Sequence, residues 1–375
     1  MTSPSLLQDP LLRPVPTLEG HKVLGKTVLL ERLGEGGAGV VYRGWHLNFR
    51  IVVAVKVLRP ELAADADYVA RFHREAHATL QITHQNVVRA HDLEERDGLH
   101  FLVMEYVDGL SARQWIHRRG RMSVDQALTA LAGAAAGLAE AHTHGLVHQD
   151  VKPSNLLLAR SGRVKVADLG LVGPAVDSDD EAAAAARRRV FGTPQYMAPE
   201  QWDGAPPQPS ADVWALGACA YYLLTGRHGL PKVAKGELRR LVRQEPFPTI
   251  GGVVRARPGF GDLLERCVDR DPARRFTDAT ALHQALLALG GVDEALLRDP
   301  DFAPGGEPVG LPANEVLARI DDQRRRRPGP AAVSAAAAPR PKVRAAPARS
   351  SAAPIVVVVL LVAAAVIVVL LRSQG

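Results

Sequence analysis

The amino-acid sequence predicts an α+β protein in which a small β-rich lobe precedes a larger helical lobe. Before Gly109 the chain alternates short β-branched runs with turn residues, a pattern typical of strands. After Gly109 it changes to long stretches in which the apolar residues have helical spacing. With 375 residues, of which 47% are hydrophobic, the chain can bury a sizeable core. We therefore expect one folded domain of two lobes at residues 26–289, after a loosely ordered lead-in at residues 1–25.

The expected elements follow one another along this domain. Strands are predicted at residues 27–33, 39–45, 51–58, 87–92 and 99–105. One helix is predicted between the third and fourth strands, at residues 67–80. In the second lobe, helices are predicted at residues 124–144, 211–224 and 261–269.

The charge and the cysteines exclude several classes of function. The formal net charge is +6, and much of it comes from two short runs, Arg187–Arg189 and Arg324–Arg327, so a nucleic-acid partner is not expected. Cys219 and Cys267 have no Cys or His nearby at ligand spacing, which argues against a disulfide framework and a zinc site. Both thiols are expected in the core of a protein in a reducing compartment. The first residues show no secretory signal peptide.

The composition changes after about residue 290. Residues 290–354 become rich in Pro, Ala and Arg, which predicts a flexible cytoplasmic linker because such a segment buries too little apolar surface to offset the entropy of ordering it. Residues 355–371 contain only Ile, Val, Leu and Ala and predict a single transmembrane helix, followed by a short extracytoplasmic tail at residues 372–375. A buried core helix is the alternative, although such a helix normally keeps one polar face.

Basic residues set the expected orientation of this span. They are more numerous before it (Arg340, Lys342, Arg344 and Arg349) than after it (Arg372). The positive-inside rule therefore places the folded domain in the cytoplasm, with a single pass through the cell (inner) membrane. A homodimer formed in the bilayer is possible on this interpretation. Arg324–Arg327 either contact anionic lipid or form a solvated charge run.

The most informative stretch runs from His148 to Asn155 and reads HQDVKPSN. Phosphoryl transfer to a hydroxyl group needs a carboxylate to orient the acceptor, a cation for the migrating group and an oxygen ligand for magnesium. Asp150, Lys152 and Asn155 could supply these in turn. A polar turn of solvated or capping side chains is the alternative. The stretch resembles the catalytic loop of eukaryotic-like (Hanks-type) serine/threonine protein kinases of the bacterial type, which have a bilobal protein kinase-like fold.

A glycine-rich segment supports this resemblance. Its residues are Gly34, Glu35, Gly36, Gly37, Ala38 and Gly39. Because the chain continues as a strand from Val40, the segment is predicted to be the tip of a β-hairpin, and not the start of a helix in a dinucleotide-binding fold. Glycines allow backbone N–H groups to approach the phosphates of a nucleotide, since no Cβ is in the way. The segment is thus expected to cover the phosphates of ATP.

The resemblance implies roles for three more charged residues. Lys56 ends an apolar run and resembles the kinase lysine that pairs with the α- and β-phosphates, although a lysine reaching from a strand to solvent is the alternative. Glu75, on the next helix, is the expected partner of Lys56 or else an exposed charge paired with Arg71. Asp168, at the start of an Asp-Leu-Gly triplet, resembles the magnesium-binding residue, and Asn155 would hold a second ion.

Further nucleotide contacts are implied around the predicted hinge between the lobes. Glu105 and Val107 would contact adenine through their backbone groups, beneath Met104. The resemblance also assigns Val40 and Ala54 to the nucleotide site. The expected cofactors are therefore ATP and Mg²⁺.

The end of the activation segment supplies scaffold residues. Gly192-Thr193-Pro194 and Ala198-Pro199-Glu200 resemble it, and Thr193 is expected to hydrogen-bond near Asp150 and Lys152. Asp212 resembles the residue that holds the backbone of the catalytic loop. Glu200 is expected to form a structural ion pair with Arg275.

The sequence departs from the family pattern at Gln149, which replaces the Arg that commonly precedes the catalytic Asp. That Arg can bind a phosphate on the activation segment, so activity here is expected not to depend on such a switch. Ser178 lies among Asp177, Asp179 and Asp180, where an added phosphate would meet like charge. We expect Ser178→Ala to keep most kinase activity; a collapse of turnover would contradict this hypothesis.

The sequence as a whole predicts a membrane-anchored serine/threonine protein kinase that uses ATP and magnesium to phosphorylate Ser and Thr hydroxyl groups of protein substrates, in signalling. One alternative is a pseudokinase scaffold that binds partners at the membrane without turnover. Another is a small-molecule kinase of related fold, which is less favoured because the Gly-Thr-Pro and Ala-Pro-Glu segments suit a groove for protein substrates.

Overall fold

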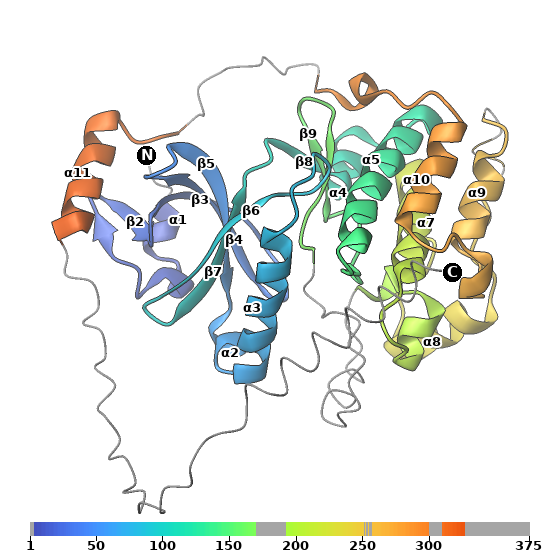
Figure 1. Cartoon of the computed structure of the whole chain (residues 1–375), viewed down its shortest axis with the longest axis horizontal. Helices are drawn as coiled ribbons and strands as arrows, with labels where there is room; N and C mark the ends of the chain where they lie inside the picture. Colours follow the sequence, from blue (N-terminus) through green and yellow to red (C-terminus); the bar gives the residue numbers. More distant parts are fainter. Residues whose placement is uncertain are drawn as a thin grey trace, which may run out of the picture. The chain divides into compact units, whose positions relative to one another are not determined.

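The computed structural model describes residues 4–169, 193–250, 252, 254, 257–299 and 310–326, without the side chains of Pro4, Ser5, Arg71 and Glu75 (Figure 1). The chain divides into two compact units, residues 1–324 and 325–375. Of the second unit, only the last two residues of helix α11 are described. The first unit contains a small lobe built on a β-sheet and a large lobe built of helices.

The small lobe is organised by an antiparallel sheet of seven strands. Its strands are, in spatial order, β1 (Thr17–Leu18), β2 (His21–Leu24), β3 (Thr27–Glu35), β4 (Gly39–His46), β5 (Ile51–Leu58), β7 (Leu99–Glu105) and β6 (Ala90–Arg96). Helices α2 (Pro60–Ala63) and α3 (Ala66–Leu80) lie between β5 and β6 in the sequence. The predicted helix at residues 67–80 is thus confirmed.

The central strand β5 is buried on both of its faces, which explains why all its residues except Lys56 are apolar. Val53, Val55 and Val57 point into a cluster with residues of the N-terminal segment. The side chain of Lys56 points to the opposite face of the strand, where it lines a cavity together with Phe72 of α3. The sequence places a charged side chain on the α3 face of an otherwise apolar strand.

The N-terminal segment is not the loosely ordered lead-in that we expected. It forms α1 (Pro4–Leu7), the 3₁₀ turn η1 (Pro10–Leu12) and strands β1 and β2. Leu6 and Leu12 are fully buried against the sheet, and the Tyr42 hydroxyl donates a 2.7 Å hydrogen bond to Asp9. The expectation was wrong because the apolar residues of this segment have no regular spacing in the sequence. They become buried by covering a face of the sheet that would otherwise be exposed.

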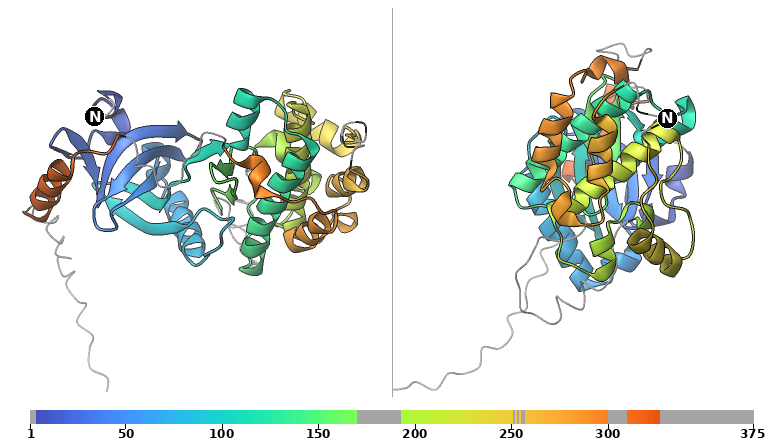
Figure 2. Two further views of the ribbon diagram at one scale, coloured as in Figure 1. Left: turned by 90° about the horizontal axis from the view of Figure 1, so that it is seen from above. Right: turned by 90° about the vertical axis from the view of Figure 1, so that its right-hand side faces the viewer.

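Part of the expected linker at residues 290–354 also belongs to the folded unit. The 3₁₀ turn η5 (Glu294–Leu297) packs on the large lobe, and helix α11 (Asn314–Arg326) packs on the small lobe. Leu317 and Ile320 of α11 are buried with Leu18, Val23 and Val28. Figures 1 and 2 show α11, in orange-red, beside the N-terminal strands. The small lobe is therefore built from both ends of the described chain.

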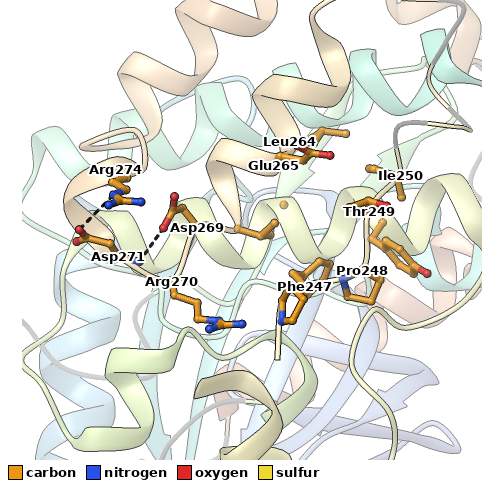
Figure 3. A pocket seen from close by; sticks show the side chains of 14 residues that line it. Phe247, Pro248, Thr249, Ile250, Leu264, Glu265, Asp269, Arg270, Asp271 and Arg274 are labelled. Atoms are coloured by element: carbon orange, nitrogen blue, oxygen red, sulfur yellow. Dashed lines mark hydrogen bonds and ion pairs between the residues drawn. The ribbon is translucent and has the colours of Figure 1, made fainter. Parts of the chain in front are cut away.

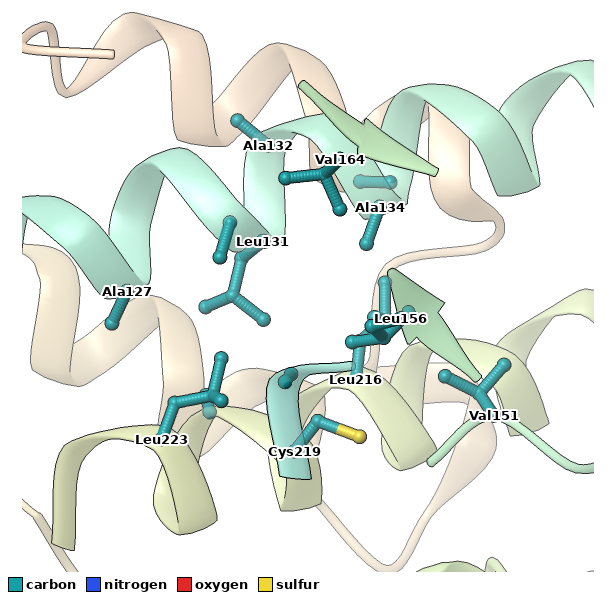
Figure 4. Packing of buried hydrophobic residues seen from close by; sticks show 14 of the residues in the cluster. Ala127, Leu131, Ala132, Ala134, Val151, Leu156, Val164, Leu216, Cys219 and Leu223 are labelled. Atoms are coloured by element: carbon teal, nitrogen blue, oxygen red, sulfur yellow. The ribbon is translucent and has the colours of Figure 1, made fainter. Parts of the chain in front are cut away.

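The large lobe surrounds helix α5 (Val124–Thr143). The other helices that the structure describes in this lobe are α4 (Ala112–Arg119), α7 (Pro209–Thr225), α8 (Lys235–Gln244), α9 (Phe260–Cys267) and α10 (Ala279–Ala288). Short 3₁₀ turns are η2 (Pro194–Tyr196), η3 (Pro199–Asp203) and η4 (Pro272–Arg274). Figure 4 shows Leu131 of α5 facing Leu216, Cys219 and Leu223 of α7. Cys219 and Cys267 are both buried free thiols, as expected.

A small sheet connects this helical core to the catalytic stretch. Its strands run in the order β10 (Val164–Val166), β9 (Leu156–Ala159) and β8 (Gly109–Ser111). Gly137 permits α5 to approach the neighbouring segment, because a Cβ there would lie 2.3 Å from the carbonyl oxygen of Asn86. This close approach allows β10 to pack against α5.

One predicted strand has different bounds in the structure. Residues 87–92 were expected to form it, but β6 begins at Ala90 and continues to Arg96. Val88 instead donates a hydrogen bond to Val166, and Val166 donates to Asn86, so residues 86–88 pair with β10 of the large lobe. A pairing with a distant strand leaves no mark on local periodicity.

No helix within the described residues is long and apolar enough to cross a membrane. The predicted span at residues 355–371 lies outside the described residues, and so do Ser178 and Arg187–Arg189.

Candidate active site

Lys56 and Asp168 form an ion pair between the two lobes, with 2.7 Å between Nζ and Oδ1. Lys56 comes from β5 and is 5% exposed, and Asp168 lies two residues beyond β10. Asp168 has a φ of 58°, in the left-handed region that a non-glycine residue seldom adopts. Burial alone would raise the pKa of Asp168, but the charge and hydrogen bond of Lys56 hold that pKa below its ordinary value. Asp168 is thus kept as a carboxylate.

Asp150 is held through both of its carboxylate oxygens. Oδ1 accepts hydrogen bonds from the N–H (2.8 Å) and the hydroxyl group (2.9 Å) of Thr193, and Oδ2 accepts one from Lys152 Nζ at 2.5 Å. The expected place of Thr193 near Asp150 and Lys152 is therefore confirmed. A carboxylate fixed in this way has a defined direction, as the orientation of an acceptor hydroxyl group requires.

Asn155 closes the loop around Asp150. Its Nδ2 donates to the carbonyl oxygen of Asp150 (3.0 Å), its N–H donates to Lys152 (2.9 Å), and its own carbonyl oxygen accepts from Ala167 (2.8 Å). Since Nδ2 is the donor, Oδ1 is the amide atom that can ligate a metal ion. The Ser154 hydroxyl lies 3.4 Å from that atom. The amide orientation suits an oxygen-liganded cation.

Asp168 and Asn155 both carry side-chain oxygen atoms of the kind that Mg²⁺ takes as ligands. Within the described chain no three side chains of His, Cys, Asp or Glu converge on a possible metal position. Mg²⁺ in phosphate-transfer sites takes one or two protein ligands and completes its shell with phosphate oxygens and water. Asp168 and Asn155 could provide this small set.

Asp212 holds the backbone of the catalytic stretch, as the sequence predicted. It is fully buried, and its two oxygens accept hydrogen bonds from the N–H groups of His148 and Gln149, both at 2.8 Å. Gln149 has a φ of 62°, so a strained residue stands directly before Asp150. The two hydrogen bonds stabilise that conformation.

His142 is a site residue that sequence reasoning missed. Its Nδ1 accepts a hydrogen bond from the Ala279 N–H (3.2 Å), so Nε2 carries the proton and donates to Asp212 Oδ2 (2.9 Å). A histidine within a helix pattern gives no signal of such a role. The catalytic stretch is thereby linked through Asp212 to α10.

The glycine-rich segment is the tip of the β3–β4 hairpin, where Glu35 is paired with Val40. The Gly36 N–H donates to the Gly39 carbonyl oxygen at 2.9 Å. A Cβ on Gly39 would lie 2.2 Å from the Val57 carbonyl oxygen, so the close approach of β4 and β5 requires glycine. Glu35 forms an ion pair with Arg59, which follows β5 and which the sequence did not single out.

The hinge residue Glu105 ends β7. Its N–H donates to the Arg89 carbonyl oxygen (2.8 Å), and its Oε2 accepts from Lys165 Nζ (2.9 Å). Of its two backbone groups, only the carbonyl group can therefore serve the adenine contact that we expected. Ala54 pairs with Met104 across β5 and β7, beside a cavity of about 30 Å³ that reaches Lys56 and Asp168.

Two expected pairings have different outcomes. The ion pair between Glu200 and Arg275 is confirmed, with distances of 2.7 and 2.8 Å and an Arg275 side chain that is buried. Glu75 lies on α3, but its side chain is outside the description, so its pairing with Lys56 stays a prediction.

A larger cavity of about 540 Å³ lies in the large lobe and contains no predicted site residue. It is bounded by α7, residues 246–250 and α9 (Figure 3). Phe247, Ile250 and Leu264 give it an apolar wall, and Arg270 and Asp271 lie on its rim. It is separate from the residues around Asp150.

Comparisons with known proteins agree with this geometry. Residues 27–287 match the family model of the protein kinase domain. Serine/threonine-protein kinase PknB of Mycolicibacterium smegmatis is 32% identical over 264 residues, which are 68% of this chain and 42% of that protein. PknL of Mycobacterium tuberculosis is 34% identical over 279 residues, which are 72% of this chain and 67% of that protein.

Solved structures give the same result. A crystal structure of the Mycobacterium tuberculosis PknI kinase domain has 28% sequence identity and a TM-score of 0.58, and the match covers 74% of this chain and 100% of that one. The bilobal fold is thus that of protein kinases. The chain belongs to the protein kinase family, and its curated relatives are serine/threonine-protein kinases. It spans less than half the length of the PknB relatives that it matches.

Proposed function

We propose that this chain is an active serine/threonine protein kinase that transfers the γ-phosphoryl group of ATP to Ser and Thr hydroxyl groups of proteins. The observation that carries the proposal is the pair of fixed carboxylates: Asp168, bound by Lys56, and Asp150, bound by Thr193 and Lys152. A pure scaffold has no chemical need for both arrangements.

Each group has a role that its surroundings support. Asp150 orients the acceptor hydroxyl group and receives its proton, and Lys152, whose Nζ lies 2.5 Å from Asp150, brings positive charge to the migrating phosphoryl group. Lys56 and the glycine-rich hairpin bind the phosphates. Asp168 and Asn155 would hold Mg²⁺, which neutralises charge on the phosphates when it is bound. The adenine ring would lie at the hinge, between Ala54, Met104, Glu105 and Val107.

A phosphoryl-transfer assay tests this activity. The purified chain, labelled ATP, Mg²⁺ and a generic protein acceptor should give phosphoserine and phosphothreonine, and Asp150→Asn should lower turnover by about 10²-fold or more. Asp108→Asn is the matched control, because Asp108 is exposed and pairs only at the surface with Arg160. Equal transfer by wild type and Asp150→Asn, or no transfer by either, would defeat the enzyme proposal and favour the scaffold alternative.

We also propose that the chain is anchored in the cell membrane through residues 355–371, with the kinase domain in the cytoplasm and a possible dimer contact in the bilayer. The support is the composition of that segment and the basic residues before it. Ala363→Lys combined with Ala364→Lys should release the protein from carbonate-washed membranes, since each charge costs about 3 kcal/mol at the centre of a span. Retention of this double variant would contradict the anchor.

A further inference from the structure

Lys165 extends from the strand that leads to Asp168 toward the hinge. It lies on β10, three residues before Asp168, and its side chain is 14% exposed. Its Nζ donates hydrogen bonds to Glu105 Oε2 (2.9 Å) and to the Val87 carbonyl oxygen (3.2 Å). One ammonium group therefore touches both the hinge and the segment that crosses between the lobes.

Glu105 is fixed by the hydrogen bond from Lys165 and by two further hydrogen bonds with Arg89. Its Oε2 also accepts a hydrogen bond from the Arg89 N–H (3.2 Å), and its own N–H donates to the Arg89 carbonyl oxygen (2.8 Å). The side chain and the peptide N–H are thus both held on the side of β6. Because Lys165 and Arg89 hold its side chain and its N–H group, the direction of the Glu105 carbonyl group is also fixed.

Strand β10 is itself anchored on both sides. Val88 donates to Val166 at 2.9 Å from the small lobe, and Ala167 donates to Asn155 at 2.8 Å in the catalytic loop. Lys165 is in the same strand, so the contact to Glu105 starts from a rigid support. Strand β10 therefore supports Asp168, which follows it, and also contacts the hinge residue Glu105 through Lys165.

We propose that Lys165 is a positioning residue for the adenine end of the nucleotide site: it holds Glu105, and through Glu105 the hinge carbonyl group, in the direction that an adenine amino group needs. This inference rests on the proposed function, because it assumes that the hinge binds the adenine of ATP. Lys165 itself touches no reacting atom and acts through Glu105.

The role predicts a specific pattern of binding. Lys165→Met removes the ammonium group but keeps an unbranched side chain. It should weaken the binding of adenosine and of ATP by the same factor, about tenfold, because a charge-assisted hydrogen bond is removed from the hinge and the phosphate contacts are unchanged. KM for ATP should rise equally, whereas kcat at saturating ATP should stay within about twofold of wild type.

Controls separate this role from a general loss of structure. Lys26→Met is the matched variant, because Lys26 forms an ion pair with Asp92 in which both side chains are well exposed, and it should change neither affinity. Lys165→Arg should recover part of the adenosine affinity. Glu105→Gln should reproduce the loss, and Lys165→Met should add little to it in the double variant. Lys165→Arg and Glu105→Gln still test the role if Lys165→Met fails to fold.

The outcomes distinguish the inference from the function on which it rests. Unchanged adenosine binding by folded Lys165→Met, or a loss for ATP but not for adenosine, overturns the positioning role while wild-type turnover stands. Wild-type protein that binds both adenosine and ATP but transfers no phosphate overturns the enzyme proposal, and the effect of Lys165 on adenosine binding remains as evidence for the hinge. Additive losses in the double variant would also contradict the inference.

Discussion

Thr193 donates two hydrogen bonds to a single oxygen of Asp150, one from its backbone N–H and one from its hydroxyl group. The other oxygen of Asp150 is bound to Lys152. The last residues of the activation segment and the catalytic loop are therefore in direct contact, and the hydroxyl contact depends on a Thr or Ser at this position.

The hydroxyl group of Thr193 is expected to set turnover and not nucleotide affinity. Thr193→Val keeps the shape and the backbone hydrogen bond but removes a hydrogen bond to a charged group, so kcat should fall about tenfold. KM for ATP should be unchanged within a factor of about two. Steady-state kinetics with a peptide acceptor measures both. Thr193→Ser restores the hydroxyl group and should recover most of the loss; equal kcat values in Val and Ser variants would contradict the role.

Asp212 is expected to stabilise the large lobe strongly. Asp212→Asn offers one acceptor oxygen to two backbone N–H groups and points an NH₂ group at the other, with an expected cost of about 2–4 kcal/mol. The midpoint of urea unfolding should fall accordingly, and turnover should fall with it because Gln149 loses its support. Asp203→Asn is the control: Asp203 makes exposed pairs with Arg239 and Arg243, and its loss should cost under about 1 kcal/mol. Similar midpoints in the two variants would refute this prediction.

Helix α11 is expected to depend on its apolar contacts. Leu317 is 8% exposed and packs against the β2–β3 region, so Leu317→Ala should cost about 2–4 kcal/mol of local stability. Amide hydrogen exchange should rise in α11 and in β2 and β3, with little change in α5. Glu315→Ala, at an exposed position of the same helix, serves as the control. Unchanged protection in the Leu317 variant would show that α11 does not stabilise the small lobe.

The buried imidazole of His46 is expected to make the free energy of unfolding depend on pH. Burial lowers the pKa of its imidazole below 6.5, with a further contribution from Lys26, and its Nδ1 accepts a hydrogen bond from the Phe49 N–H (3.1 Å). A lowered pKa in the folded state means that the unfolded chain binds more protons, so the free energy of unfolding should fall as the pH drops below 6.5 toward the folded-state pKa. His46→Asn keeps an acceptor near Nδ1 and should flatten this dependence between pH 7.5 and 5. Parallel curves for the two proteins would contradict the assignment.

Much of the fold was visible in local patterns. The β-branched run at Val53–Val57 and the helical spacing at residues 67–80 and 124–144 predicted main elements of the fold. The N-terminal segment was missed because its leucines become buried only against a sheet that forms later in the chain. Helix α11 carried a signal in the spacing of Leu317 and Ile320, but the surrounding Pro, Ala and Arg content outweighed it.

The site residues also fall into two groups, those that local sequence patterns could place and those that they could not. Asp150, Thr193 and Asp212 could be placed because fixed motif spacings locate them. Among the described side chains, Lys56 pairs with Asp168, 112 residues away, and no local pattern predicts such a contact. His142, Arg59 and Lys165 were missed for the same reason: each acts through a contact with a residue far away in the sequence.

The place of α11 has a consequence for the order in which the molecule is made. Arg319 and Glu19 are in contact although 300 residues separate them. The β-sheet of the small lobe therefore lacks one of its covering elements, α11, until nearly the whole folded unit has left the ribosome. Contacts of such long range close late and slowly. During synthesis, the apolar patch around Leu18, Val23 and Val28 therefore stays open to chaperones while the large lobe already folds.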